Sequence, residues 1–278
     1  MGIKTLLPFL RKRCPEAFSS LSDGGRSFLS NKSVAVDVSN QVHKILYLVN
    51  TTDVSTFERA CRDQIRWFLG CRSRPVFVFD GKTPQAKKQT CAKRRSVKQE
   101  YRDKARQATE RSMHTKAAQY ERLALCPDGR HYEAFRRACT SLGCSHLTAD
   151  GEAERHCVEM ENLGSVDAIV SDDTDVLALG CRHMLLRVSS SHCQLVDGQV
   201  VRDSLEMTTP TFRDFCILCG TDVNDRMSRV GPVTAFKLLR SQGSLEGVLC
   251  HLREKGQQDV DDFEGCLPVA RAFLTTRD

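Results

Sequence analysis

The chain has 278 residues, enough for about two domains or for one domain with a large insertion. Charged residues make up 27% of it and hydrophobic residues 40%, which indicates a globular protein and excludes disordered, collagen-like and membrane chains. No apolar run approaches the roughly 20 residues of a membrane span, and the stretch at residues 6–10 is broken by Pro8 and followed by basic residues. We therefore expect no signal peptide, no membrane partner and an intracellular location.

Short apolar runs at residues 33–38 and 74–80 predict two buried parallel strands, each reaching an aspartate at or near its C-terminal end. Between them, apolar residues recur at helical spacing over residues 57–69, which predicts a crossover helix with Ser55 as its capping candidate. The alternation predicts an α/β fold with a mostly parallel central sheet flanked by helices. Further strands are expected at residues 166–170, 184–188 and 194–201.

Residues 82–130 interrupt this alternation and hold the positive charge of the chain. They contain 14 Lys and Arg against 5 Asp and Glu, a net charge of +9. Since the whole chain has a net charge of +6, the rest of the chain carries −3. The segment is polar and favours helix, but it lacks a broad apolar stripe and therefore cannot bury a face. We expect an exposed, mobile helical insertion.

After Pro210 the pattern becomes helical again, with helices expected at residues 212–219, 233–239 and 245–252 and a turn at Gly231-Pro232.

The first of these helices contains the one C-x-x-C pair of the sequence, Cys216 and Cys219. No second pair follows at zinc spacing and the run is apolar, so we favour core packing over a metal or redox role. The fourteen cysteines are scattered along a chain too long to need disulfides, which favours free thiols in a reducing compartment.

Acidic residues gather near the ends of the expected strands, the edge where open α/β sheets bind ligands. Each has a structural alternative: Asp80-Gly81 suits a turn, Ser171 and Asp172 suit a helix cap, and Glu152 suits the first turn of a helix. The positions are Asp37, Asp80, Glu152, Glu154, Asp172, Asp173, Asp175 and Asp222.

Together, these carboxylates would repel one another by about 4 kcal/mol per pair at 4 Å and an effective dielectric of about 20, unless they protonate or bind cations. Oxygen ligands without a Cys or His cluster select Mg²⁺ or Mn²⁺ over zinc. A calcium loop is disfavoured because Leu177 takes the next alternate position after Asp173 and Asp175, and the EF-hand glycine and terminal Glu are missing. Two such cations beside a basic segment point to phosphodiester hydrolysis.

Six ordered motifs resemble those of the flap endonuclease family of XPG/Rad2-type structure-specific 5′ nucleases, and they cover nearly the whole chain. The motifs are MGIK at residues 1–4, AVDVS at 35–39, VFVFDGKTP at 76–84, GEAE at 151–154, SDDTD at 171–175 and CILCGTD at 216–222. The resemblance implies a PIN-like nuclease core, a helical arch and a helix-three-turn-helix DNA-binding region. The nuclease core is expected at residues 1–80 and 132–207, and the arch at residues 81–131. The helix-three-turn-helix and the C-terminal helices are expected at residues 208–278.

The resemblance implies a structure-specific 5′ flap endonuclease and 5′-3′ exonuclease that hydrolyses phosphodiesters in branched DNA during replication and repair. It implies a two-metal-ion mechanism with Mg²⁺, for which Mn²⁺ is expected to substitute. The first ion would be held by Asp37, Asp80, Glu152 and Glu154, and the second by Asp173, Asp175 and Asp222, partly through water.

Lys87 and Arg94 occupy the positions at which the family places a Lys and an Arg that reach the scissile phosphate; solvated surface charge is their alternative. Surface charge is the favoured interpretation for Lys88, Arg95 and Lys98. His43 lies where many members place a base-stacking Tyr, although a core or surface histidine is equally compatible. The expected DNA-binding residues are Gly2, His43, Lys82, Lys87, Lys88, Lys93, Arg94, Arg95, Arg229 and Gly231.

Residues 228–232 resemble the turn with which the family grips downstream duplex, often with a K⁺ ion. Arg229 stands where a Gly is usual, and Val233-Thr234 replace a basic pair, so the resemblance is weaker at this K⁺ site.

The expected partner is branched DNA with a 5′ flap, nick or gap, bound by a monomer. Residues 257–264 lack the paired aromatics of a sliding-clamp-binding tail, which favours a shortened chain or a compact, virus-encoded enzyme without a clamp partner. The expected location is the nucleus or another site of DNA replication, cytoplasmic for a viral enzyme.

Two alternatives remain beside the flap endonuclease. A four-way-junction resolvase or a mainly exonucleolytic member belongs to the same superfamily, whereas a non-catalytic nucleic-acid-binding scaffold should lack some of the seven acidic positions. None of the seven is missing.

Overall fold

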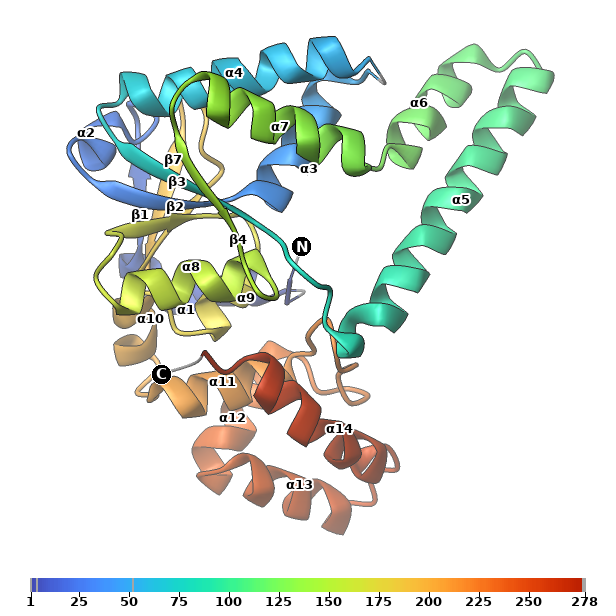
Figure 1. Ribbon diagram of the computed structural model, residues 1–278. Coiled ribbons are helices and arrows are strands. Elements are labelled where there is room, and N and C mark those ends of the chain that lie inside the picture. The colour runs from blue at the N-terminus through green and yellow to red at the C-terminus, as the bar shows by residue number, and fades with distance from the viewer. Residues whose placement is uncertain (1, 4, 52, 277–278) are drawn as a thin grey trace. The chain divides into compact units, whose positions relative to one another are not determined.

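The computed structural model describes residues 2, 3, 5–51 and 53–276. Seven strands of these residues form one mixed sheet in the order β1-β7-β6-β5-β2-β3-β4, and fourteen α-helices accompany it (Figure 1). The predicted α/β sheet is confirmed; β3 with β4 and β5 with β6 pair in parallel, whereas β7 runs antiparallel to both of its neighbours. By packing, the chain divides into one unit of residues Met1–Ala35 and Glu154–Asp278 and a second of Val36–Ala153.

The second unit contains the basic segment and the helices that precede and follow it. Its elements are α3 (Val38–Val49), α4 (Val54–Gly70), β3 (Arg74–Phe79), the 3₁₀ turn η2 (Gln85–Lys87), α5 (Lys88–Glu110), α6 (His114–Ala124), α7 (Gly129–Ser141) and β4 (Ser145–Thr148). Strand β2 (Ser33–Asp37) enters it from the first unit.

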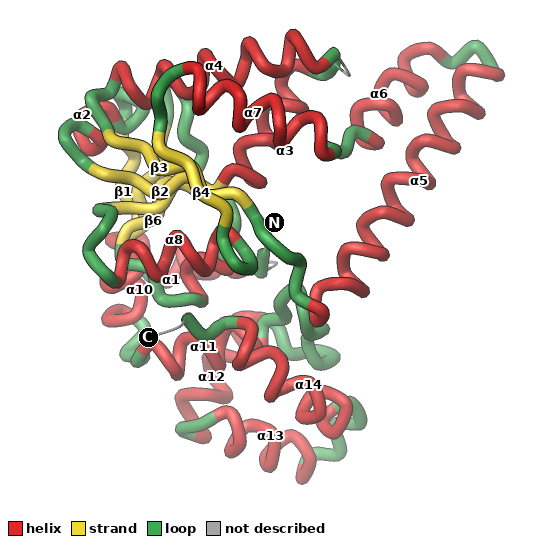
Figure 2. The backbone as a smooth tube through the Cα atoms, viewed as in Figure 1, coloured by secondary structure: helices red, strands yellow, loops and turns green. Residues whose placement is uncertain are grey.

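Helices α4 and α7 lie on one face of strands β3 and β4 (Figure 2). The packing is aromatic: Phe77 of β3 lies 5.4 Å from Phe135 of α7 and 6.1 Å from Phe68 of α4, between ring centroids. Six-residue β3 is β-branched and aromatic as well as buried, so it suits a covered strand. This packing fixes the end of β3, where the first acidic motif begins.

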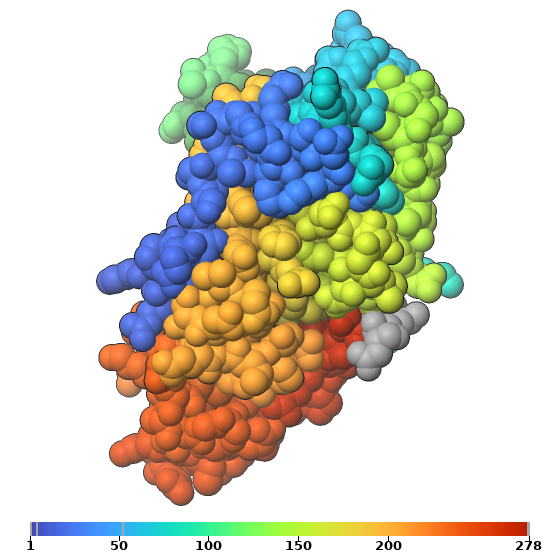
Figure 3. Space-filling model, turned by 90° about the vertical axis from the view of Figure 1, so that its left-hand side faces the viewer, coloured from blue at the N-terminus to red at the C-terminus, as the bar shows by residue number. Residues whose placement is uncertain are grey.

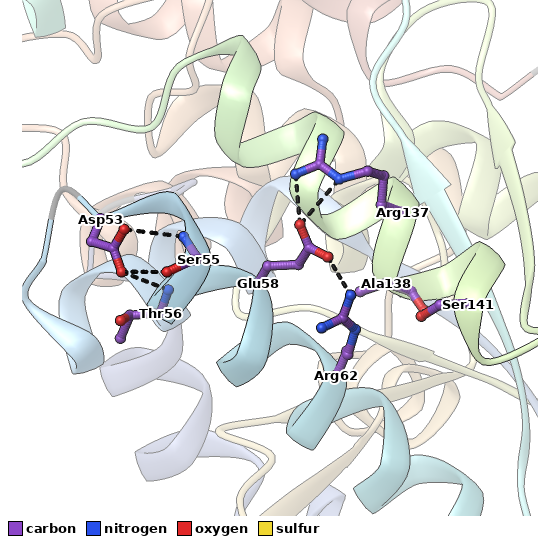
Figure 4. A network of polar contacts seen from close by, with 8 residues as sticks. All are labelled: Asp53, Ser55, Thr56, Glu58, Arg62, Arg137, Ala138 and Ser141. Carbon is purple, nitrogen blue, oxygen red and sulfur yellow. Dashed lines mark hydrogen bonds and ion pairs between the residues drawn. The ribbon is translucent and has the colours of Figure 1, made fainter.

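A polar network on the outer side holds the same two helices together (Figure 4). Glu58 of α4 accepts from Arg62 one turn on and from Arg137 of α7, the latter at 2.6 Å. At the start of α4, the carboxylate of Asp53 accepts the backbone N–H groups of Ser55 and Thr56. The predicted helix is therefore confirmed, but its cap is Asp53 and not Ser55, because Asp53 satisfies two of the free N–H groups of the first turn.

Helices α5 and α6 form an antiparallel hairpin, named here the basic arm (Figure 1, teal to green). Its predicted helical, exposed character is confirmed. The expectation that it buries no face is wrong, because a narrow stripe of alanines, including Ala105 and Ala117, is buried between the two helices. Tyr101 and Tyr120 stack across the same seam with centroids 6.3 Å apart. Small side chains let two polar helices approach closely without a broad apolar stripe.

The first unit carries the other strands and all of the C-terminal helices. Its elements are α1 (Leu6–Arg13), η1 (Pro15–Ala17), β1 (Phe18–Leu21), α2 (Arg26–Leu29), α8 (Ala153–Asn162), β5 (Ala168–Val170), α9 (Asp175–Ala178), β6 (His183–Leu186), β7 (Cys193–Asp197), α10 (Gly198–Ser204), α11 (Thr209–Leu218), α12 (Pro232–Gln242), α13 (Leu245–Glu254) and α14 (Val260–Phe273).

The strand predicted for residues 194–201 is too long, since β7 ends at Asp197 and α10 begins at the next residue. The Asp197 carboxylate accepts the N–H groups of Gln199 and Val200, which starts a helix in spite of the β-branched residues that follow. Gly198 is required there, because a Cβ at this position would lie 2.2 Å from the carbonyl oxygen of Cys181.

Helices α11 to α14 pack as a continuous block (Figure 3, orange to red). Arg271 of α14 joins three of them through Asp214 of α11 at 2.7 Å and Glu246 of α13 at 2.8 Å. Cys216 and Cys219 are buried in α11, so the preference for core packing is confirmed, and all fourteen cysteines are free thiols. None of the helices that the structure describes combines the length and apolar composition that crossing a membrane requires.

Candidate functional site

Asp37 stands where β2 meets α3 and is fully buried. Its carboxylate accepts the backbone N–H of Asn40 at 3.2 Å and thereby caps α3. The cap and the location at a strand end are compatible, because the cap uses a single carboxylate oxygen, Oδ1. The prediction that this residue lies at or near the C-terminal end of a buried strand is confirmed, although the strand ends at Asp37 and not at residue 38.

Asp80 follows β3 directly and is held from two directions. One carboxylate oxygen accepts the N–H of Ala153 at 2.8 Å, and the other accepts the hydroxyl of Ser39 on α3. Gly81 lies so close to the chain of Ala149 that a Cβ would stand 2.0 Å from its carbonyl oxygen. No turn forms at Asp80-Gly81; Gly81 instead donates its N–H to the carbonyl of Gly151 at 2.7 Å, which brings Asp80 against the segment that contains Glu152.

Lys87 forms an ion pair with Glu152, with 2.5 Å between Nζ and Oε1. The two side chains are only 9% and 16% exposed, so Lys87 is not the solvated surface charge considered as its alternative. Charges are seldom buried unless they are paired, and this pair joins a residue predicted to meet phosphate with one predicted to hold metal. The structure thereby brings together three of the predicted residues of this unit, Asp80, Lys87 and Glu152.

His43 and Arg94 lie near each other at the base of the basic arm. The pKa of His43 is lowered, first because surrounding protein desolvates the partly exposed ring and then because Lys98 and Arg94 repel its charge. Lys98 itself donates to the carbonyl of Leu123 at 2.6 Å, at the C-terminal end of α6. It therefore stabilises the arm, as cations do at helix C-termini, and is not simply surface charge. The other basic candidates, Lys82, Lys88, Lys93, Arg94 and Arg95, are exposed.

Tyr132, in the first turn of α7, is a neighbour of this site that the sequence analysis missed. Its hydroxyl lies 3.3 Å from the hydroxyl of Ser39. Burial raises the pKa of Tyr132 to about 12, and the nearby carboxylates of Asp80 and Asp37 add to the shift. No motif pointed to Tyr132 because its role depends on the packing of α7 and not on spacing along the chain.

In the other unit, Asp173 and Asp175 follow β5 and are 2% and 3% exposed. Asp173 accepts the N–H of Asp175 at 3.1 Å, and its own N–H donates to Ser171 Oγ at the same distance. Asp172, between them in the motif, faces elsewhere and accepts the N–H of Arg187 at 2.5 Å. Asp173 and Asp175, the two residues that the resemblance assigns to a metal, therefore bond within this loop, whereas Asp172 supports the backbone at Arg187.

The described part of the N-terminus packs on the same loop. A Cβ at Gly2 would lie 2.2 Å from Asp173 Oδ1, and the N–H of Ile3 donates to Thr174 Oγ1 at 2.7 Å. Gly2 has a φ of 78°, a conformation that glycine adopts without strain. Gly2 thus lies against an acidic residue, whereas Met1 and Lys4 of the same motif are outside the described residues.

Asp222 lies after α11 and is 8% exposed. Its loop begins at Gly220, whose φ of 85° suits a helix C-terminus, and is fixed by Asn224. The Asn224 amide donates to the carbonyl of Ile217 at 2.9 Å, and its side-chain oxygen accepts from Thr221 at 2.6 Å. Glu154, in the first turn of α8, is also buried at 8% exposure.

The turn before α12 is held by the segment that precedes α14. Ser228 donates its N–H to Asp259 at 2.6 Å, and Gln257 donates to the carbonyl of Ser228 at 3.2 Å. The bond from Ser228, and a second one that Gln257 donates to the Asp259 carboxylate at 2.5 Å, lower the pKa of Asp259. Arg229 has a φ of 64°, so it keeps the left-handed backbone that a Gly would adopt there without strain. Gly231 precedes the first residue of α12, Pro232.

The seven carboxylates of the predicted metal sites are thus described in two groups. Asp37, Asp80 and Glu152 lie in one unit; Glu154, Asp173, Asp175 and Asp222 lie in the other. Within the described residues, no three acidic, His or Cys side chains stand together in an arrangement ready to hold a metal. The donors themselves fit a hard cation, because all seven are carboxylates; five of them are buried, Glu152 is partly buried and Asp80 is exposed.

Comparison with known proteins gives concordant results. The XPG N-terminal domain model matches residues 1–101 and the XPG I-region model matches residues 143–222. Flap endonuclease 1 of Mycosarcoma maydis is 30% identical over 275 residues, which covers 94% of this chain and 73% of that protein.

Solved structures share the fold at lower identity. The catalytic core of Rad2 in complex with DNA substrate matches with a TM-score of 0.67 and 22% identity over 95% of this chain and 76% of that chain. Human GEN1 in complex with Holliday junction DNA matches with a TM-score of 0.62 and 17% identity over 97% of this chain and 63% of that chain. Likeness to the junction enzyme is a likeness of fold, whereas likeness to the flap endonucleases extends to sequence. The chain belongs to the XPG/Rad2-type flap endonuclease family of nucleases.

Proposed function

We propose that this protein is a structure-specific 5′ flap endonuclease with 5′-3′ exonuclease activity, which hydrolyses phosphodiesters of branched DNA in replication and repair. The observation that carries the proposal is the acidic set: all seven carboxylates are present, and each follows a strand, begins a helix or lies in a loop fixed by hydrogen bonds. A protein that keeps the fold only to bind DNA has no reason to keep buried carboxylates that repel phosphate.

Two Mg²⁺ ions, replaceable by Mn²⁺, are proposed as the cofactors. Bound there, they would lower the pKa of the attacking water and stabilise the charge of the in-line transition state. The proposed ligands of the first ion are Asp37, Asp80, Glu152 and Glu154, and those of the second are Asp173, Asp175 and Asp222. Asp37, Asp80 and Asp173 already accept backbone N–H groups, which orient these carboxylates before any cation arrives.

Lys87 and Arg94 are proposed to contact the scissile phosphate. Lys87 lies directly before the basic arm, and its ammonium group forms the ion pair with Glu152. A phosphate oxygen offers the same kind of charged acceptor as that carboxylate, so substrate can replace one partner of Lys87 by another. Exposed Arg94 supplies a second positive charge from the next turns of α5.

DNA binding is proposed to use the basic arm and the turn at residues 228–231. Residues 82–130, which include the arm, carry a net charge of +9, whereas the rest of the chain carries −3. Each phosphate that the arm neutralises strengthens binding in a salt-dependent way. The turn presents backbone groups, which hold duplex DNA without reading its bases. Arg229 adds a phosphate contact at this turn, where the family often has K⁺, and His43 is proposed to stack on a base.

We further propose that the protein acts as a monomer, in the nucleus or at another site of DNA replication. The nuclease core, arch and helix-three-turn-helix region are assigned to the residue ranges expected from the sequence.

The testing experiment is cleavage of labelled 5′ flap, nicked, gapped and four-way DNA with Mg²⁺ or with EDTA. The proposal predicts incision near the base of the 5′ flap with Mg²⁺ and none with EDTA. Preferred, symmetrical cutting of the four-way junction would favour a resolvase instead, and binding without cleavage of any substrate would favour a scaffold.

A further inference from the structure

A chain of hydroxyl groups leads from the helix that follows the basic arm to Asp80. Ser39, in the first turn of α3, donates to one carboxylate oxygen of Asp80, and the hydroxyl of Tyr132, in the first turn of α7, lies 3.3 Å from Ser39 Oγ. All three residues belong to the same unit of the structure. None of the six motifs contains Tyr132, and the proposed chemistry makes no use of Ser39.

The direction of these hydrogen bonds follows from their chemistry. A serine hydroxyl has one proton, and Ser39 gives it to Asp80, so the contact with Tyr132 is made with Tyr132 as donor. Because burial raises the pKa of Tyr132 to about 12, the phenol keeps its proton throughout the neutral range. Tyr132 therefore donates to Ser39 and Ser39 donates to Asp80, so both O–H dipoles stabilise the negative charge of the Asp80 carboxylate.

The chain complements the backbone contact on the other side of Asp80. Its second oxygen accepts the N–H of Ala153 at 2.8 Å, so each oxygen has one fixed donor. An ionised carboxylate offers about four acceptor positions. Two donors thus fix the rotation of the Asp80 side chain and leave acceptor positions for a cation.

Tyr132 stands on a firmly anchored part of α7. Asp128 caps this helix together with His131, and the His131 ring packs edge-on against Phe57 with centroids 4.9 Å apart. The first turn of α7 directly follows the end of the basic arm along the chain. The capped start of α7 therefore connects the end of the arm to Tyr132.

We propose that Tyr132 and Ser39 are positioning residues that hold Asp80 in its metal-binding orientation. They also connect Asp80 to the first turn of α7, which follows the basic arm along the chain. This inference rests on the proposed function, since it takes Asp80 as a metal ligand. Removal of a group that orients a metal ligand by a hydrogen bond commonly lowers metal affinity or activity by about 10–100-fold. Neither residue needs to touch DNA or the reacting phosphate.

The test compares Tyr132→Phe, Ser39→Ala and Ser39→Thr with the wild type and with Tyr47→Phe as a matched control. Tyr47 lies on α3 as Ser39 does, is exposed, and meets Arg122 through its ring face rather than its hydroxyl. Mn²⁺ binding to the protein alone is measured by electron paramagnetic resonance, with melting temperature recorded for each variant. Single-turnover flap cleavage is then measured as a function of Mg²⁺ concentration.

We expect Tyr132→Phe and Ser39→Ala to weaken Mn²⁺ binding by about tenfold and to raise the Mg²⁺ concentration for half-maximal cleavage by a similar factor. Excess Mg²⁺ should restore most of the rate, DNA affinity should stay within about twofold, and Ser39→Thr should behave like the wild type. Wild-type Mn²⁺ affinity and Mg²⁺ dependence in a folded Tyr132→Phe protein would overturn the inference. A wild type that binds Mn²⁺ but cuts no flap would overturn the proposed function instead.

Discussion

Replacing Lys87 by Ala tests both the ion pair and the role assigned to it. The pair joins Lys87 to Glu152 over 2.5 Å, with side chains 9% and 16% exposed. Removing one partner of a buried pair costs about 3–5 kcal/mol, because the other charge is left without compensation. Since water still reaches Glu152 in part, we expect about 3 kcal/mol, the lower end of that range. At roughly 2 °C per kcal/mol for a chain of this size, the melting temperature should fall by about 6 °C.

The same substitution removes the charge proposed to meet the scissile phosphate. Loss of one such group slows chemistry by about 10²–10³-fold, and because the contact is made at the reacting phosphate, affinity should change far less. Scanning calorimetry without metal gives the melting temperature, and rapid-quench cleavage of a 5′ flap gives the single-turnover rate. Binding is followed separately by fluorescence anisotropy of a labelled flap in Ca²⁺.

Two controls separate stability from catalysis. Lys88→Ala removes the exposed neighbouring lysine and should leave the melting temperature unchanged. Lys87→Met combined with Glu152→Leu removes both charges and should recover stability while remaining inactive. An unchanged melting temperature in Lys87→Ala would refute the ion pair, and an unchanged single-turnover rate would refute the phosphate contact.

Three further predictions concern the acidic residues, the basic arm and the half-buried phenol of Tyr132. Asp175→Ala should abolish cleavage while flap binding persists in anisotropy measurements, and turnover comparable to the wild type would remove Asp175 from the metal site. Raising salt from about 50 to 200 mM should weaken flap binding by more than tenfold, whereas a flat response would contradict phosphate binding by the basic arm. Because the pKa of Tyr132 is raised to about 12, its contribution to stability is complete below the ordinary tyrosine value near 10 and is lost as pH rises through about 12. Absorbance titration of the wild type against Tyr132→Phe should show no ionisation of this phenol at pH 10, and ionisation there would contradict its burial.

Several elements could be predicted because local pattern and tertiary packing agree. Strands β2 and β3 are apolar apart from Ser33, Asp37 and Arg74 at their ends, and a buried strand tolerates few polar residues in its interior. Where two local signals compete, the sequence does not decide between them. Asp53 and Ser55 both suit a helix cap, and the Asp197 carboxylate overrides the β preference of the valines that follow. Helix α14 was missed because it contains Pro268, which ordinarily argues against helix.

The candidate site shows the same division. Asp37 and Asp80 could be predicted because strand ends are ligand-binding positions in this class of fold. The burial of Lys87 could not, since it depends on Glu152, which is distant in sequence. Tyr132 carries no spacing signal at all, because only the packing of α7 brings its hydroxyl toward Ser39.

The central claim is that carboxylates from separate parts of the chain hold two divalent cations that act on a phosphodiester. Anomalous diffraction from crystals of the protein with flap DNA, soaked in Mn²⁺, measures this directly. We predict two manganese peaks, one within coordination distance of oxygens of Asp37, Asp80, Glu152 or Glu154 and the other reached, directly or through water, by Asp173, Asp175 or Asp222. Crystals with ordered DNA and no manganese at any of these carboxylates would contradict the account.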